Sequence, residues 1–186
     1  MKNNCRGFTL LEIIVSVGIL AGISLVVVQA FITTTRTNTK TEILKEVKQN
    51  GDYAIEIMSR MIRNARNIVS SPCSAGGDAS GDITITNRDS RTTTFRCVVD
   101  AGNGVIRIAS SSGTTDEFLT NNTVTLFDNV AQAPGCNINA LQFTCLAVAG
   151  VPSSIKIEFT LAQKGTSPDQ VDKAKISFQT SAQLRR

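Results

Sequence analysis

The chain has 186 residues, of which 41% are hydrophobic and only 18% charged, and this length fits one domain with an additional element. It contains no histidine, no tryptophan and a single tyrosine. The usual general base at neutral pH and the commonest imidazole ligand of metals are therefore missing. The formal net charge is +4, from 19 Lys and Arg against 15 Asp and Glu. This composition argues against most classes of enzyme, and we expect no cofactor.

The positive excess lies in the N-terminal part of the chain. Residues 33–69 hold seven basic and four acidic side chains, whereas residues 70–186 hold ten of each. Binding to nucleic acid needs clustered positive charge. We therefore expect no nucleic-acid partner for the C-terminal part.

The spacing of potential ligands does not predict a metal site. None of the five cysteines stands in a C-x-x-C pair, and no histidine is present to complete a mixed zinc site. Asp78 with Asp82, or Asp169 with Asp172, could donate oxygen atoms to calcium. Two aspartates in a loop are, however, more typical of a solvated turn than of a calcium site.

An uncharged apolar run follows a single carboxylate, Glu12. Residues 13–32 are apolar enough and long enough to cross a bilayer core of about 30 Å as one helix. An export signal would have a shorter apolar core with a small-x-small cleavage site after it. A carboxylate at the edge of such a helix is costly unless it is neutralised or paired, so Glu12 is a candidate functional residue. Gly18 and Gly22 share one helix face and would permit close packing.

Helical periodicity continues beyond the apolar run to about residue 69. Apolar side chains recur there at intervals of three and four residues, while most charged side chains fall on other faces. Gly51 interrupts the pattern and weakens the helix locally by about 1 kcal/mol relative to alanine. We expect one helix over about residues 8–69, whose second half needs a domain to cover its apolar face. The apolar positions are Ile43, Leu44, Val47, Ala54, Ile55, Met58, Met61, Ile62, Ala65, Ile68 and Val69.

After residue 70 the pattern changes to short segments in which apolar and polar residues alternate. Such segments are typical of strands with one buried and one solvated face. Residues 74–81 and 110–115 are predicted to be flexible loops. A twisted antiparallel sheet laid on the apolar face of the helix satisfies both patterns, so we expect an α+β fold. The predicted strands are residues 83–86, 92–99, 105–108, 141–145, 155–161 and 175–179.

An ordered set of residues precedes the apolar run. Lys2 and Arg6 form a short basic leader, Gly7 and Phe8 follow, and Glu12 is the fifth residue counted from Phe8. Together with the apolar run, this arrangement resembles the class III signal of type IV pilins and pseudopilins. In that family the glycine precedes the scissile bond, and the aromatic residue begins the mature chain.

The resemblance implies that a prepilin peptidase cleaves between Gly7 and Phe8 and that Phe8 is then N-methylated. Lys2 and Arg6 would keep the leader on the cytoplasmic side. The new amine of Phe8 is a cation at the membrane edge, and Glu12 would neutralise it within the chain or on a neighbouring subunit during assembly. Glu12 is thus predicted to be an assembly residue and not a catalytic acid. The alternative is an interfacial carboxylate that reaches water.

Three further stretches resemble a subgroup of the family. Residues 50–53 and 58–66 resemble the stem of J-type or W-type minor pilins, and so do residues 178–186 at the C-terminus. The resemblance implies a pilin fold with a long N-terminal helix packed on an antiparallel β-sheet head. The implied parts are a leader at residues 1–7, a transmembrane and filament-core helix at 8–35, an amphipathic stem at 36–69 and a β-rich head at 70–186.

The function implied by the resemblance is that of a minor type IV pilin, or of a J-like pseudopilin of type II secretion, which primes or tips a pilus or pseudopilus. Its partners would be other pilins or pseudopilins, the prepilin peptidase and methyltransferase, an assembly platform protein and an ATPase. Before assembly it would span the inner membrane once, with its head outside the cytoplasm. The alternatives are a pilus adhesin or DNA-uptake pilin, which would be a binding module, and a tethered enzyme, for which no nucleophile motif is present.

Four cysteines follow the apolar helix and would reach a disulfide-permitting compartment with the head. Cys73, Cys97, Cys136 and Cys145 allow three connectivities. Because short loops close most easily, we favour Cys73 with Cys97 and Cys136 with Cys145. Buried free thiols are the alternative. Cys5 lies in the leader and is expected to be lost with it.

Overall fold

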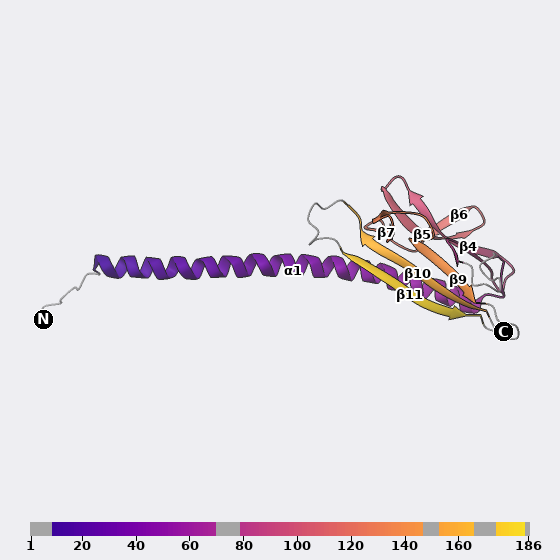
Figure 1. Ribbon diagram of the computed structural model, residues 1–186, viewed down its shortest axis with the longest axis horizontal. Coiled ribbons are helices and arrows are strands. Elements are labelled where there is room, and N and C mark those ends of the chain that lie inside the picture. The colour runs from indigo at the N-terminus through magenta and orange to yellow at the C-terminus, as the bar shows by residue number, and fades with distance from the viewer. Residues whose placement is uncertain (1–8, 70–78, 147–152, 166–173, 185–186) are drawn as a thin grey trace. The chain divides into compact units, whose positions relative to one another are not determined.

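The computed structural model describes residues 9–69, 79–146, 153–165 and 174–184 (Figure 1). The described residues form one helix and eleven strands, and the chain divides into two compact units, Met1–Glu42 and Ile43–Arg186. The helix begins in the first unit and ends in the second, which also contains every strand. The elements are α1 (Leu10–Asn64), β1 (Asn67–Ile68), β2 (Ala79–Ser80), β3 (Ile83–Thr86), β4 (Thr92–Asp100), β5 (Val105–Ser112), β6 (Thr115–Phe118), β7 (Val124–Asp128), β8 (Ala133–Pro134), β9 (Leu141–Leu146), β10 (Ser154–Gln163) and β11 (Lys175–Gln183).

In the second unit, α1 buries one of its faces. Most of its buried residues stand three or four positions apart, the interval that places side chains on one side of a helix. Ile43, Leu44, Ile55 and Met61 lie partly buried beside them. The amphipathic helix predicted from the apolar periodicity is confirmed. The buried residues are Val47, Gly51, Ala54, Met58, Ser59 and Ile62.

Gly51 does not interrupt α1, so the expectation from the sequence is wrong at this residue. The helix passes through Gly51, and a methyl group added there would overlap the ring of Phe178 in β11. That ring is buried and stacks on Phe159 of β10, with ring centroids 5.2 Å apart. The missing side chain allows β11 to approach the helix closely, although glycine in a helix interior costs about 1 kcal/mol.

Replacing Gly51 by alanine is therefore expected to destabilise the second unit. The methyl group gains about 1 kcal/mol of helix propensity, but it must displace the stacked Phe178 ring, and overpacking of this kind costs about 1–3 kcal/mol. We expect a net loss of about 1 kcal/mol, measured as a lower urea midpoint of the full chain in detergent. Asp52→Ala is the control, because Asp52 is exposed and its replacement gains helix propensity without an overlap. A Gly51→Ala variant more stable than the parent would contradict the close approach.

The helix ends at Asn64, earlier than the periodicity predicts. The N–H of Ala65 donates to the carbonyl of Ile62 at 3.2 Å, which tightens the last turn, and β1 then pairs with β3. In that pairing Ile68 lies opposite Ile85. Apolar spacing over so few residues fits a helix or a short strand equally well. The pairing partner, which is distant along the chain, decides between them.

One antiparallel sheet has five strands in the order β1-β3-β4-β5-β6. The predicted three-stranded meander forms its centre, because β3, β4 and β5 pair in chain order. The segment 110–115, predicted to be a flexible loop, is mostly strand. Ser110 and Ser111 belong to β5 and pair with β4 on one side and β6 on the other, and the turn into β6 contains Gly113, whose φ is 72°.

The second sheet has six strands, with β10 at its centre. β11 pairs with residues 154–162 on one side of β10, while β9 pairs with residues 154–159 and β7 with residues 161–163 on the other side. The strands predicted at residues 141–145, 155–161 and 175–179 are confirmed as β9, β10 and β11. The strands β1, β2, β6, β7 and β8 were not predicted. The strand β2 falls within residues 74–81, which were predicted to be a flexible loop. A long N-terminal helix with antiparallel sheets is the α+β, pilin-like fold that we expected.

The core of the second unit joins α1 to both sheets, because buried residues of β3, β4 and β5 belong to the same cluster as those of α1 and the six-stranded sheet. Ile155, Ile157 and Leu161 of β10 are fully buried in one cluster with Met58 and Ile62 of α1. The intervening residues of β10 point to the opposite face, as the strand repeat requires. The sheet thus has one apolar face against the helix and one polar face.

Candidate functional site

The N-terminus of α1 is capped by Thr9. The Oγ1 atom of Thr9 accepts a hydrogen bond from the backbone N–H of Glu12 at 3.3 Å, and the Thr9 carbonyl accepts one from Ile13 N–H at 3.2 Å. A threonine before a helix with glutamate three residues later is the pattern of a capping box. Thr9 was not among the residues predicted from the sequence. Its spacing from Glu12 nevertheless indicates that the helix begins directly after Thr9.

Glu12 lies in the first turn of α1 among apolar side chains. Its neighbours Leu10 and Leu11 are 78% and 74% exposed. The helix macrodipole favours a carboxylate at this end by about 0.3–1 kcal/mol, which is less than the roughly 2.5–3.5 kcal/mol that a charge costs at the centre of a membrane helix. In a lipid setting a carboxylate at the edge of the apolar run is costly unless it pairs with a cation or reaches water. Gly7 and Phe8, the predicted cleavage and methylation residues, lie outside the described residues.

The hydroxyl side chains along the exposed part of α1 form hydrogen bonds inside the helix. Ser16 Oγ donates to the carbonyl of Glu12 and Ser24 Oγ to that of Leu20, both at 2.7 Å. Six threonines between residues 33 and 41 make the same bond to the carbonyl four residues earlier, at 2.8–3.2 Å. An unpaired hydroxyl in hydrocarbon costs several kcal/mol, about 4 or more. These bonds make the helix surface compatible with lipid despite its polar residues.

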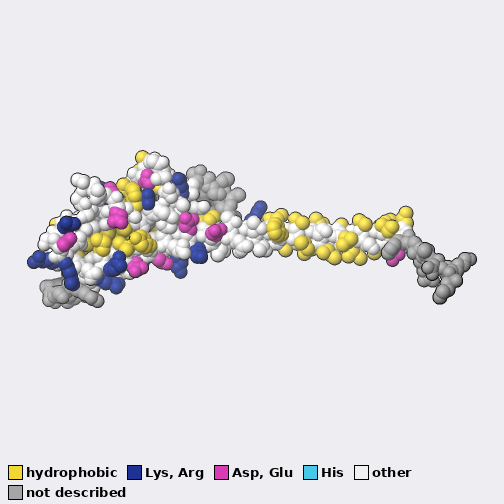
Figure 2. Space-filling model, turned by 180° about the vertical axis from the view of Figure 1, so that it is seen from behind, with side chains coloured by type: hydrophobic (Ala, Val, Ile, Leu, Met, Phe, Trp, Pro, Cys, Tyr) yellow, Lys and Arg dark blue, Asp and Glu magenta, His cyan; other side chains and the backbone are white. Residues whose placement is uncertain are grey.

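The first unit exposes its apolar side chains on all sides. Residues 10–42 of α1 are all exposed, and Figure 2 shows apolar side chains along the part of the helix that begins at its N-terminal end. By length and composition α1 can cross a membrane. Monomeric soluble proteins rarely expose so large a contiguous apolar surface. The first unit therefore needs lipid or other helices around it.

Gly18 and Gly22 lie on this exposed surface, four residues apart on one helix face. A Cβ atom added at either position would meet no other atom of the described residues within 4 Å. Small residues at this spacing let helix backbones approach closely. Any helix that uses this face must therefore come from another molecule, and its packing stays a prediction.

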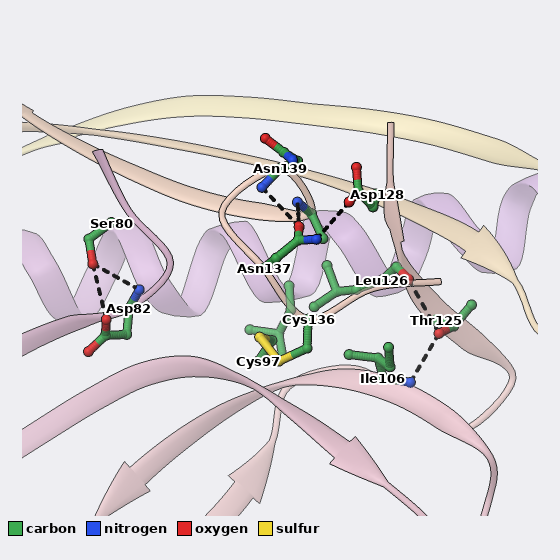
Figure 3. The surroundings of a disulfide bond; sticks show 12 residues. Ser80, Asp82, Cys97, Ile106, Thr125, Leu126, Asp128, Cys136, Asn137 and Asn139 are labelled. Atoms are coloured by element: carbon green, nitrogen blue, oxygen red, sulfur yellow. Dashed lines mark hydrogen bonds between the residues drawn. A yellow bond between two sulfur atoms is a disulfide. The ribbon is translucent and has the colours of Figure 1, made fainter. Parts of the chain in front are cut away.

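A disulfide joins Cys97 to Cys136, with Cα atoms 5.6 Å apart (Figure 3). It connects β4, in the five-stranded sheet, to the segment between β8 and β9 of the other sheet. Both pairs favoured from the sequence, Cys73 with Cys97 and Cys136 with Cys145, are therefore wrong. Cys145 is also disulfide-bonded, and Cys73 lies outside the described residues.

The preference for short loops fails because distance along the chain does not report distance in the fold. The observed bond spans 39 residues. Cys145 is buried in β9 opposite Ile155 of β10, whereas Cys136 is exposed in the segment that lies against β4. The loop entropy that favours near neighbours changes slowly with length, so the tertiary arrangement decides the pairing.

Asp128 organises the segment that carries Cys136 (Figure 3). Its Oδ2 atom accepts from Asn137 Nδ2 at 2.6 Å, and its Oδ1 atom accepts from the N–H groups of Val130 at 2.7 Å and Ala131 at 3.0 Å. Donation by the Asn137 amide, and next by Ala131 N–H, holds the pKa of Asp128 below its usual range. The carboxylate is ionised at neutral pH and serves as a fixed acceptor for the turn.

Other polar contacts of the head serve to hold the five-stranded sheet together. Arg96 pairs with Asp116 at 3.0 Å, and Arg107 pairs with Asp100 at 3.2 Å. The Arg107 guanidinium also lies 3.8 Å from the centroid of the Phe118 ring. Arg107 joins β5 to its neighbours β4 and β6, whereas the Arg96–Asp116 pair reaches across β5 from β4 to β6. These residues show no arrangement of nucleophile and base. The candidate functional residues therefore remain those of the N-terminus.

Residues 2–28 match a family model described as the prokaryotic N-terminal methylation motif. The match includes Gly7, Phe8 and Glu12 and leaves the second unit outside it. No curated protein and no solved structure gives a significant match to the chain. The motif supports a prepilin of the type IV pilin or pseudopilin type, a kind of structural subunit. The resemblance inferred from the sequence is confirmed for the N-terminal signal, and the minor-pilin subgroup stays a prediction.

Proposed function

We propose that the chain is a minor type IV pilin or a J-like pseudopilin, which is cleaved after Gly7, N-methylated at Phe8 and assembled into a pilus or pseudopilus as a priming or tip subunit. In this proposal each part has one task. The parts are the leader (residues 1–7), the transmembrane and filament-core helix (8–35), the amphipathic stem (36–69) and the β-rich head (70–186).

The observation that carries the proposal is the junction of a methylation motif with an exposed apolar helix. The motif covers residues 2–28, and the helix that starts inside it stays exposed through residue 42. Its hydroxyl groups are bonded within the helix, so its surface suits lipid first and neighbouring helices afterwards. Storage in a membrane followed by packing in a filament uses both properties.

Glu12 has a defined task in this proposal. Hydrolysis of the bond between Gly7 and Phe8 releases the leader and leaves a new amine on Phe8, which is protonated at neutral pH. The Glu12 carboxylate pairs with that amine, within the chain or on the next subunit. In surroundings of low dielectric constant such a pair removes two isolated charges at once. Pairing between subunits would therefore favour entry into the filament.

The proposed subunit spans the inner membrane once before assembly, with its head outside the cytoplasm. Lys2 and Arg6 on the cytoplasmic side support this orientation. The disulfide between Cys97 and Cys136 is in keeping with an oxidising compartment. The proposed partners are other pilins or pseudopilins, the prepilin peptidase and methyltransferase, a platform protein and an assembly ATPase.

A pilus-associated binding module is the second candidate, favoured by a hollow of about 250 Å³ on the polar side of the six-stranded sheet. Its amide and hydroxyl groups suit an uncharged polar ligand such as a glycan, and they give no support to DNA binding. A glycan array probed with the full chain would distinguish this role from assembly alone. The polar lining includes Asn129, Asn139, Gln142, Glu158, Thr160, Ser177 and Gln179.

The intact mass of the chain, produced together with an active prepilin peptidase, tests the proposed processing. We expect a mass that lacks residues 1–7 and carries one additional methyl group. A Gly7→Val variant is the control, because a branched side chain beside the scissile bond should block cleavage and preserve the full-length mass. A full-length mass for the unaltered chain, in cells that process another prepilin, would refute the proposal.

A further inference from the structure

Strand β11 lies at an edge of the six-stranded sheet. It pairs with β10 over its whole length of nine residues, and no other strand pairs with it within the described parts of the chain (Figure 1). Alternate residues of such an edge direct N–H and C=O groups away from the sheet, which forms a template for another strand. Proteins commonly blunt exposed edges with proline or charge. β11 contains no proline, and Lys175 at its start is its only charged residue.

Two hollows meet at Thr180 in this strand, one on each face of the sheet. The first, of about 420 Å³, lies between β11 and α1, and Arg60 and Arg63 of the helix line it. The second, of about 470 Å³, lies on the polar face and is lined by Lys156 and Gln179. A strand added beside β11 would point alternate side chains to the two faces. It would therefore fill both hollows while its backbone bonds to the edge, a known mode of peptide recognition.

The hollow beside α1 is positively charged. Arg60 and Arg63 are exposed. Neither guanidinium group makes an ion pair or a hydrogen bond to any residue in the described ranges. Glu56 lines the same hollow, four residues before Arg60, without an ion pair to it. Two cations therefore face one anion. Lys156 adds a cation on the other face, where it pairs with Glu158 at 2.9 Å. Acidic side chains complement this surface.

From these observations we propose that the outer edge of β11 binds an extended acidic segment of a partner protein as an additional strand. The backbone of the segment pairs with the middle of β11, around Thr180. Its acidic side chains reach Arg60 and Arg63 on one face of the sheet, and the side chains between them enter the hollow beside Gln179 on the other. The proposal concerns the second unit and does not depend on the N-terminal motif.

A selection with surface-displayed random peptides of about twelve residues tests the proposal, with the full-length chain in detergent micelles as the target. We expect enriched peptides with acidic residues at alternate positions. They should bind the double variant Arg60→Glu/Arg63→Glu about tenfold or more weakly, because two favourable charge contacts become repulsive. Lys48→Glu is the matched control, since Lys48 is exposed on the same helix and lines neither hollow, and it should bind normally.

N-methylation of the peptide backbone tests strand pairing without changing the protein. An added strand uses every second N–H group toward its neighbour. One peptide is N-methylated at its odd-numbered residues and a second at its even-numbered residues. We expect one of the two to lose binding and the other to retain it.

Four results would each overturn the proposal. The first is that no peptide is enriched, as expected if another segment of this chain occupies the edge. The second is that the peptides bind equally to the parent and to the Arg60→Glu/Arg63→Glu variant. The third is that the two N-methylated peptides bind equally. The fourth is that an oligothymidylate, which itself binds through the arginines, displaces the peptides. The last would assign the surface to nucleic acid.

Discussion

Replacing Glu12 by glutamine is expected to leave leader removal intact and to lower incorporation of the chain into filaments by about tenfold or more. Glutamine keeps the length of the side chain and one acceptor oxygen but removes the charge that would pair with the amine of Phe8. A hydrogen bond to a charged group contributes about 1.5–3 kcal/mol, and 1.4 kcal/mol is a factor of ten in an equilibrium. Glu12→Ala should behave alike, since it removes the same charge.

The matched control for this experiment is Glu42→Ala. Glu42 is an exposed acid on the same helix, beyond the apolar run, and its loss should not change incorporation. Processing is measured by intact mass, and incorporation by immunoblot of filaments sheared from cells. Normal incorporation of both Glu12 variants would refute the role of Glu12 in assembly. Loss of leader cleavage would instead indicate a role in recognition by the peptidase.

Replacing Cys97 and Cys136 together by serine is expected to lower the free energy of unfolding of the head by about 4 kcal/mol. The disulfide closes a loop with a sequence separation of 39, and chain-entropy arguments give roughly this value for such a loop. It also joins the two sheets, so its loss removes a covalent connection between them. Pulse proteolysis of the full chain in increasing urea measures the change without relying on tryptophan, which the chain lacks.

The paired control is Cys5→Ser, which alters only the proposed leader and should leave the stability of the mature chain unchanged. Peptide mapping without reduction should give one linked peptide containing Cys97 and Cys136. It should join Cys145 to Cys73, the one other cysteine that we place in the head. A peptide linking Cys73 to Cys97, or an unchanged urea midpoint for the double variant, would refute this account of the disulfide.

The sequence alone determined those features that depend on neighbours along the chain. The uncharged run, the residues from Lys2 to Glu12 and the helical periodicity through Ile62 are local patterns, and each leads directly to a structural or functional expectation. The strands β3, β4, β5, β9, β10 and β11 follow from alternation over a few residues. The cap at Thr9 is also a local feature, because the spacing of Thr9 from Glu12 indicates it.

Only the tertiary structure decided those features that depend on residues distant in sequence. Gly51 belongs inside the helix because Phe178 packs against it, and Ile68 is in a strand because Ile85 lies opposite. Cys97 meets Cys136 because two sheets bring them together, although shorter loops were available. The energy of such contacts is set by the arrangement of whole elements. Local patterns therefore predict the helix and the six strands β3, β4, β5, β9, β10 and β11, and packing between elements determines the disulfide and the surface of β11.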